Sequence, residues 1–214
     1  MTSRLAQLAQ RAREQGQPAA AQEICEMCSL PIPAEHRHLL DLESRELLCA
    51  CRACATLFDH AAAGGRHFKL VPDRRARLVD FELSDLLWAE LRIPVDMAFF
   101  FFASREQRVM AFYPSPMGPT ESLLQLDAWQ ELEAANPVLH GMKEDVEALL
   151  VNRAKGARQY WLVPIDDCYR LVGLIRTRWR GLTGGREVWE ELVRFFDELD
   201  KRAAPAGAAA AGRS

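Results

Sequence analysis

Apolar and polar residues are arranged along this chain in two ways, one typical of strands and one typical of helices. Two pairs of short apolar runs, each pair joined by a polar segment, predict two buried hairpins. Apolar residues spaced three and four apart predict helices. The predicted strands are 67–71, 77–81, 95–103, 107–113, 146–151 and 159–163, and the predicted helices are 84–91, 127–136, 166–180 and 186–201. Hairpins interleaved with helices indicate an α+β fold with a largely antiparallel sheet.

Several local signals refine these elements. The run of phenylalanines at 99–102 places aromatic rings on both faces of one strand, so both faces must be covered. Ser84, Asp127 and one of Asp166 or Asp167 are expected to cap helices. Three prolines in 114–119 predict a rigid loop. The last two helices are expected to bury one face each, formed by Cys168, Leu171, Val172, Ile175 and Trp179 and by Trp189, Leu192, Val193, Phe196 and Leu199.

The pattern divides the chain into four regions. Residues 1–22 are expected to form an N-terminal arm or docking helix, and 23–60 a small cysteine-bearing module. A small-residue segment at 61–65 links this module to an α+β body at 66–201. The Ala-, Gly- and Pro-rich tail at 203–214 has almost no bulky side chain, so it is predicted to be disordered.

The strongest chemical signal is a pair of C-x2-C motifs, Cys25 with Cys28 and Cys51 with Cys54, separated by 22 residues. Two such turns can present four thiolates tetrahedrally to one ion. The apolar segments between them predict a hairpin, which indicates a zinc-ribbon or rubredoxin-like module whose folding depends on the metal. One Zn²⁺ is the expected ion, because closed four-cysteine sites are the usual structural zinc arrangement, and one iron is the alternative.

Cys49 lies two residues before the second motif, and two interpretations of it are open. In the first, it is a buried thiol of the small core. In the second, it lies beside the metal as an extra or alternate ligand or as a redox-reactive thiol. His36 and His38 share one strand face by alternation. We expect that face to point to solvent, so neither histidine is predicted to be a ligand.

Composition narrows the function further. The formal net charge is -3 and the pI is about 6.0, which argues against a nucleic-acid binder that relies on positive charge. The longest apolar run, 97–103, is too short to cross a membrane, and residues 1–22 lack the apolar stretch of a secretory signal. A cytoplasmic protein without membrane insertion is therefore expected. In that reducing compartment clustered cysteines indicate metal ligands rather than disulfides.

Other candidate residues favour structural roles. Asp166, Asp167 and Cys168 resemble a place for acid or thiol catalysis, but helix capping and burial explain them as well. His140 has no visible partner. The chain shows no phosphate-binding loop and no catalytic triad order, so an enzyme is disfavoured. The loop at 114–122 and the basic helix end at 176–180 are the expected contact surfaces for a partner.

Five strings add a resemblance to a known family. They are Cys25–Ile32, Cys49–Cys54, Phe112–Pro116, Asp145–Leu150 and Pro164–Gly173. Across roughly 23–200 the chain resembles an uncharacterised bacterial family encoded beside genes for oxygen-tolerant, actinobacterial-type nickel–iron hydrogenases. The resemblance implies an accessory role in maturation, assembly or electron delivery, with hydrogenase subunits or maturation factors as protein partners. It implies no catalytic residues.

Overall fold

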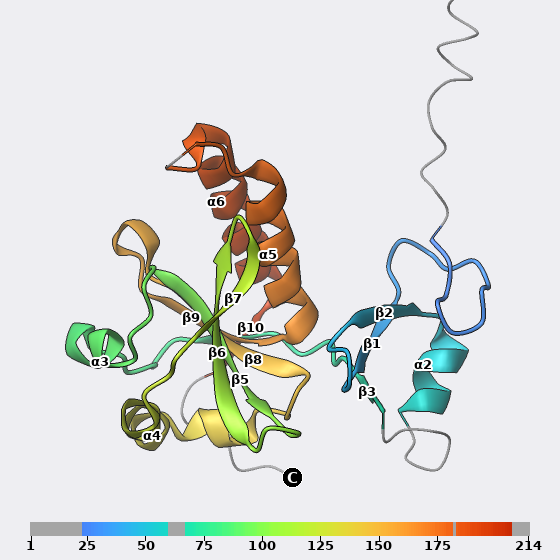
Figure 1. The fold of residues 1–214 in the computed structure, drawn as a ribbon, viewed down its shortest axis with the longest axis horizontal. Helices are drawn as coiled ribbons and strands as arrows, with labels where there is room; N and C mark the ends of the chain where they lie inside the picture. Colours follow the sequence, from blue (N-terminus) through green and yellow to red (C-terminus); the bar gives the residue numbers. More distant parts are fainter. Residues whose placement is uncertain (1–22, 60–66, 182, 207–214) are drawn as a thin grey trace, which may run out of the picture.

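The chain folds into a seven-stranded sheet flanked by helices, with a three-stranded sheet and a short helix beside it (Figure 1). The computed structural model describes residues 23–59, 67–181 and 183–206. Nearly all strand pairs are antiparallel, which confirms the predicted α+β class. The predicted arm at 1–22 and linker at 61–65 lie outside the described residues. Between residues 23 and 206 we find no described helix with the length and apolar character that a bilayer crossing requires.

The large sheet has the strand order β10-β4-β9-β8-β5-β6-β7. Its central strands carry the most continuous apolar runs because both of their faces are buried. The strands are β4 (Ala76–Leu78), β5 (Met97–Ala103), β6 (Arg108–Ser115), β7 (Gly118–Ser122), β8 (Glu147–Asn152), β9 (Gln159–Pro164) and β10 (Ala204–Ala206). The two predicted hairpins, β5–β6 and β8–β9, are both confirmed.

Helices cover both faces of this sheet. Phe99 and Phe101 pack in one core with α5 (Ile165–Arg178) and α6 (Gly185–Arg202). Phe100 packs in a second core with α3 (Asp85–Glu90) and α4 (Leu126–Ala135). The expectation that both faces of the phenylalanine strand are covered is therefore confirmed. Two short 3-10 helices, η2 (Pro137–Gly141) and η3 (Ala154–Gly156), complete the body.

The cysteine-bearing module consists of a hairpin, a helix and a third strand. These are β1 (Arg37–Asp41), β2 (Leu47–Ala50), α2 (Arg52–Phe58) and β3 (Phe68–Leu70). The hairpin turn is closed by Asp41, whose Oδ1 accepts from the backbone N–H groups of Glu43 and Ser44 at 2.7 and 3.1 Å. The predicted hairpin is confirmed, whereas α2 was not predicted.

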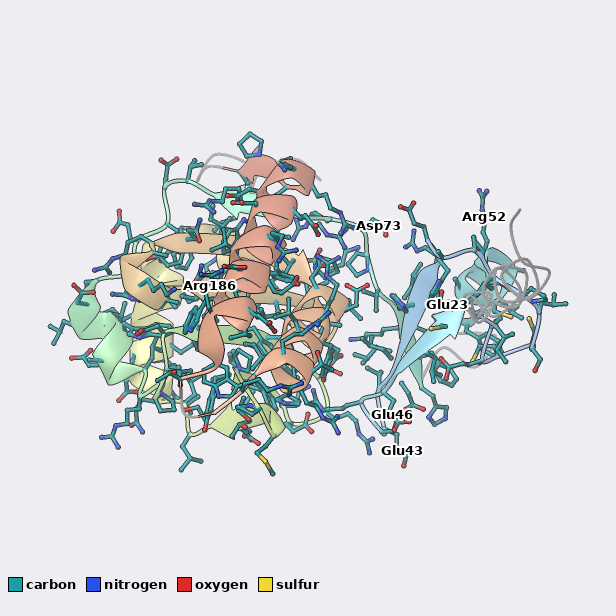
Figure 2. All side chains as sticks on the ribbon, turned by 90° about the horizontal axis from the view of Figure 1, so that it is seen from above. Glu23, Glu43, Glu46, Arg52, Asp73 and Arg186 are labelled. Carbon is teal, nitrogen blue, oxygen red and sulfur yellow. The ribbon has the colours of Figure 1, made fainter. Side chains whose placement is uncertain are left out.

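The module packs against the α5 side of the body (Figures 1 and 2). Leu40 of β1 and Val71, just after β3, belong to the same apolar core as Phe99. Polar contacts surround this apolar contact, and they pair Arg45 with Glu106 at 2.6 Å, Lys69 with Asp145 at 2.6 Å, and His38 with Asp166 at 2.9 Å. The module is therefore held by both burial and charge.

Three strand-level expectations need correction. The segment predicted as a proline-rich loop is the β6–β7 hairpin, in which Pro114 faces Pro119. Pro119 is tolerated because β7 is an edge strand, and Pro114 because β6 is paired with β5 only as far as Phe112. The tail predicted to be disordered from 203 instead begins with β10, which pairs in parallel with β4, while 207–214 lie outside the described residues. The strand predicted at 67–71, at the start of the body, is β3, which pairs with β1 of the small sheet.

The first residues of the helices and their buried faces also differ in part from the prediction. Ser84 caps α3 as predicted, its hydroxyl accepting from the Leu87 N–H at 3.0 Å. Asp127 does not cap α4, because that helix begins one residue earlier, after Gln125. The residue before α5 is Pro164, which leaves Asp166 and Asp167 in the first turn. The buried face of α6 is rotated from the predicted one: Val193 is exposed, and Val188 and Phe195 are buried instead.

Candidate metal centre

The first cysteine pair lies in a tight turn before β1. The Cys25 N–H donates to the Leu30 carbonyl at 2.8 Å, and the Ser29 N–H donates to the Cys25 carbonyl at 2.7 Å. Ser29 has a φ of 61°, the left-handed conformation that folds the chain back at this point. As a result Cys25 is fully buried and Cys28 is exposed at the rim.

The second pair lies at the start of α2. Cys51 is the residue that precedes the helix, and its sulfur accepts from the Cys54 backbone N–H at 3.4 Å. The Cys54 side chain is buried under the first turn. The Glu26 N–H donates to the Cys49 carbonyl at 2.9 Å, which ties the first turn to the strand that leads into the second. This bond holds the two pairs at a fixed distance.

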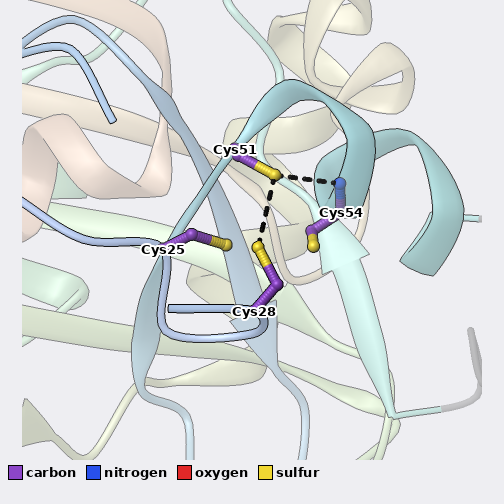
Figure 3. Close-up of side chains that lie close together, drawn as sticks. All are labelled: Cys25, Cys28, Cys51 and Cys54. Carbon is purple, nitrogen blue, oxygen red and sulfur yellow. Dashed lines mark hydrogen bonds between the residues drawn. The ribbon is translucent and has the colours of Figure 1, made fainter. Parts of the chain in front are cut away.

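The four sulfurs converge on one point (Figure 3). All lie within 4.8 Å of one another, and the Sγ atoms of Cys28 and Cys51 are 3.8 Å apart. A tetrahedron with zinc–sulfur bonds of about 2.3 Å has sulfur–sulfur edges of about 3.8 Å. A disulfide would need about 2.05 Å, and all six cysteines are free thiols. The cluster therefore has the dimensions of a four-thiolate metal site.

The electrostatics of the cluster also suit a cation. Burial acts to raise the pKa of Cys25, but backbone N–H groups of Cys51, Met27 and Cys28 outweigh it and lower the pKa to about 6. Burial raises the pKa of Cys54, and the neighbouring thiols raise it further. Without an ion, Cys25 thus ionises readily, whereas Cys54 resists ionisation beside that negative charge. A divalent cation would offset that repulsion and allow all four thiols to ionise.

Cys49 does not belong to this group. Burial raises the pKa of its thiol, and the nearby charges of Glu26 and Glu23 raise it further, so Cys49 is held as a weakly reactive thiol. Its side chain instead lies with His36 and His38, and one ligand atom of each lies within 4.8 Å of the others. The expectation that the histidine face points to solvent is wrong, since the His36 side chain is only 7% exposed.

The other candidate residues do not form a site. Asp166 lies against His38, whereas Asp167 pairs with Arg75 at 2.5 Å. Cys168 is fully buried in the core, where burial raises the pKa of its thiol well above the usual value. His140 is exposed on η2. Asp166, Asp167 and Cys168 are therefore not grouped into one site at the start of α5.

The basic helix end and the proline-containing segment are both accessible. Arg176 and Arg178, at the end of α5, and Arg180, two residues beyond it, are exposed. Trp179 is not a free stacking surface, because it packs against Trp189 with ring centroids 6.4 Å apart. Met117, at the tip of the β6–β7 hairpin, is 90% exposed.

Fold and cluster together define an α+β protein with a small four-cysteine module that could bind a metal ion. Residues 24–203 match the model of a family described as Family of unknown function (DUF5947), and the chain belongs to that family. Neither a curated protein nor a solved structure matches the chain.

Proposed function

We propose that the chain is a zinc-binding accessory protein that acts through contacts with other proteins. The observation that carries this proposal is the convergence of four sulfurs, from a turn and a helix start, at the spacing of a tetrahedral thiolate site. A closed site of this kind has no open coordination position for a substrate. Its role is therefore to fold the module and hold its surface.

Zinc fits the module better than a disulfide or an empty cluster would. Among the described residues, the small core of the module has six buried members, and two of them are Cys25 and Cys54. A core this small supplies little stability by itself, so a structural ion would contribute much of the folding free energy.

The proposed partner is a nickel–iron hydrogenase, either one of its subunits or one of its maturation factors. Support comes from the resemblance of the cysteine strings and the Pro164–Gly173 string to a family encoded beside such hydrogenases. The exposed tip at Met117 and the arginines at the end of α5 are the proposed contact surfaces. An exposed hydrophobic tip and an unburied cationic helix end both suit partner binding.

Co-purification from cells that express the hydrogenase tests this role. We expect the tagged full-length chain to recover a hydrogenase subunit or maturation factor. Reversing two charges with Arg176→Glu and Arg178→Glu should reduce the recovery, whereas Arg186→Glu, at an exposed position on α6, should not. Recovery of neither kind of partner by the wild-type chain would contradict the role.

A second candidate function is a rubredoxin-like electron carrier in which the same cysteines hold iron. One observation favours it: Cys28 is exposed at the rim of the cluster, which would give an electron a short path to a docked partner. Four thiolates suit iron as well as zinc. An aerobically purified iron form would be red, and its thiolate-to-iron bands would bleach on reduction.

A further inference from the structure

A second group of metal-binding side chains lies on the hairpin of the module, apart from the four-cysteine cluster. His38 of β1 is paired directly with Cys49 of β2 across the antiparallel ladder. Side chains at paired positions lie on the same face, and His36, two residues before His38, shares it. One ring nitrogen of each histidine and the Cys49 sulfur lie within 4.8 Å of one another. The alternation of side chains along the strands therefore places three potential metal ligands on one face of the hairpin.

Both imidazoles are oriented by hydrogen bonds that their Nδ1 atoms donate. His36 Nδ1 lies 3.0 Å from the Pro33 carbonyl oxygen and 3.1 Å from a Glu23 carboxylate oxygen. His38 Nδ1 lies 2.9 Å from a carboxylate oxygen of Asp166. Since each Nδ1 faces acceptors, its N–H donates to them and the lone pair is left on Nε2. Metal-binding histidines are oriented by carboxylates and carbonyls in this way.

The group contains a buried polar atom that no described residue satisfies. The His36 side chain is only 7% exposed, and within 23–59, 67–181 and 183–206 its Nε2 has no hydrogen-bond partner. The second oxygen of Asp166, Oδ1, is likewise buried without a partner among the residues that the structure describes. An unpartnered buried polar atom is costly, and it needs a reason. A bound cation would satisfy the nitrogen and offset the surrounding carboxylates.

We propose that His36, His38 and Cys49 form a second metal site, which takes a borderline divalent cation such as Zn²⁺. The ion is held by two Nε2 atoms and one thiolate, and the Cys49 proton leaves to solvent when it binds. No electron is transferred. Two imidazoles and one thiolate suit zinc, and three protein ligands leave the fourth position open to water or a partner's side chain. Unlike the four-cysteine cluster, this site is thus built to bind something further.

The site also links the module to the body. Asp166 lies in the first turn of α5, 128 residues from His38 in the chain. An ion on His38 strengthens the hydrogen bond to Asp166, because a coordinated imidazole is a stronger donor. Metal occupancy therefore stabilises the docked arrangement of the module on the body.

Cobalt and zinc titrations of the full-length, metal-free, reduced chain test the proposal. We expect the wild-type chain to bind two equivalents of Co²⁺ with distinct visible spectra. His36→Ala, His38→Ala and Cys49→Ser should each bind one equivalent with an unchanged four-thiolate spectrum, which also shows that the module is folded. His140→Ala, at an exposed histidine of η2, should keep both equivalents. Asp166→Asn should weaken the second equivalent by about 10–100-fold.

X-ray absorption of the wild-type chain gives an answer that does not depend on the folding of any variant. Zinc added as the second equivalent should show mixed nitrogen and sulfur ligands. Sulfur-only ligation of every equivalent that the wild-type chain takes up overturns the second site. Mixed nitrogen and sulfur ligation of a single equivalent would instead mean that the four-cysteine site fails, so the two failures are distinguishable.

Discussion

Lys69 Nζ lies 2.6 Å from Asp145 Oδ2, and this ion pair joins the small sheet to the body. Asp145 is only 3% exposed, and its other oxygen accepts from the Ser104 backbone N–H at 2.8 Å. Burial alone would raise the pKa of this carboxyl, but the bonds from Lys69 and Ser104 outweigh it and hold the pKa below its ordinary value. The buried carboxylate therefore depends on the module for its charge partner.

Removing the cation should destabilise the protein. Lys69→Met leaves the Asp145 carboxylate buried without its partner, which should cost about 1–3 kcal/mol of unfolding free energy. Urea unfolding of the two proteins measures this loss of unfolding free energy. The control is Arg186→Met, which removes a pair between exposed side chains on α6 and should cost less than about 0.5 kcal/mol. Equal losses in the two variants would contradict the role given to Lys69.

Low pH should remove the difference in unfolding free energy between the wild type and Lys69→Met. The pKa of Asp145 is lower in the folded chain than its ordinary value of 3.8, so the pair contributes fully above about pH 4. The contribution is lost as the pH falls through the lowered pKa, because the carboxyl is then protonated in both states. We expect the stability gap between the two proteins to be constant from pH 7 to about pH 5 and to shrink below about pH 4. A gap that widens with acid would contradict this assignment.

Metal removal should unfold the module and leave the body folded. All five tryptophans lie outside 23–60. A chelator should therefore speed amide hydrogen exchange at Leu39 and Ala55, which belong to the small core, while Leu149 in the central strand stays protected. The tryptophan fluorescence should not change. Equal loss of protection at Leu149 would show that the module and the body unfold together.

Cys168 should resist chemical modification in the folded chain. Its side chain is fully buried, and burial raises the pKa of the thiol, so the reactive thiolate is not formed at neutral pH. Iodoacetamide should label Cys168 only after denaturation, whereas the exposed Cys28 should be labelled in the metal-free chain. Mass spectrometry of the digested protein measures both. Labelling of Cys168 in the native chain would revive a role as a reactive thiol.

The elements predicted best from the sequence are the strands that are buried on both faces of the sheet. The phenylalanine strand and the β8–β9 hairpin are long apolar runs because each lies in the middle of the sheet. The four-cysteine cluster was predictable because its spacing has few other uses. The geometry of the cluster was not predictable, because α2 is only seven residues long and begins inside the second motif.

What the sequence could not show depends on contacts between distant segments. The histidine face was assigned to solvent by alternation, but Asp166 of α5 lies against it. β3 has three residues and no period to read, so its pairing with β1 depends on the tertiary fold. A His-x-His pair followed by a cysteine on the returning strand of a hairpin is the signal that would have indicated the second group.

Metal content of the freshly purified full-length chain, measured with its optical spectrum, tests the central claim most directly. We predict a colourless protein that contains zinc, and at least one equivalent less in the Cys25→Ser/Cys28→Ser variant, with Cys168→Ala as the unchanged control. Equal zinc in wild type and the double variant would contradict the four-cysteine site. A red protein with thiolate-to-iron bands would instead assign the site to electron transfer.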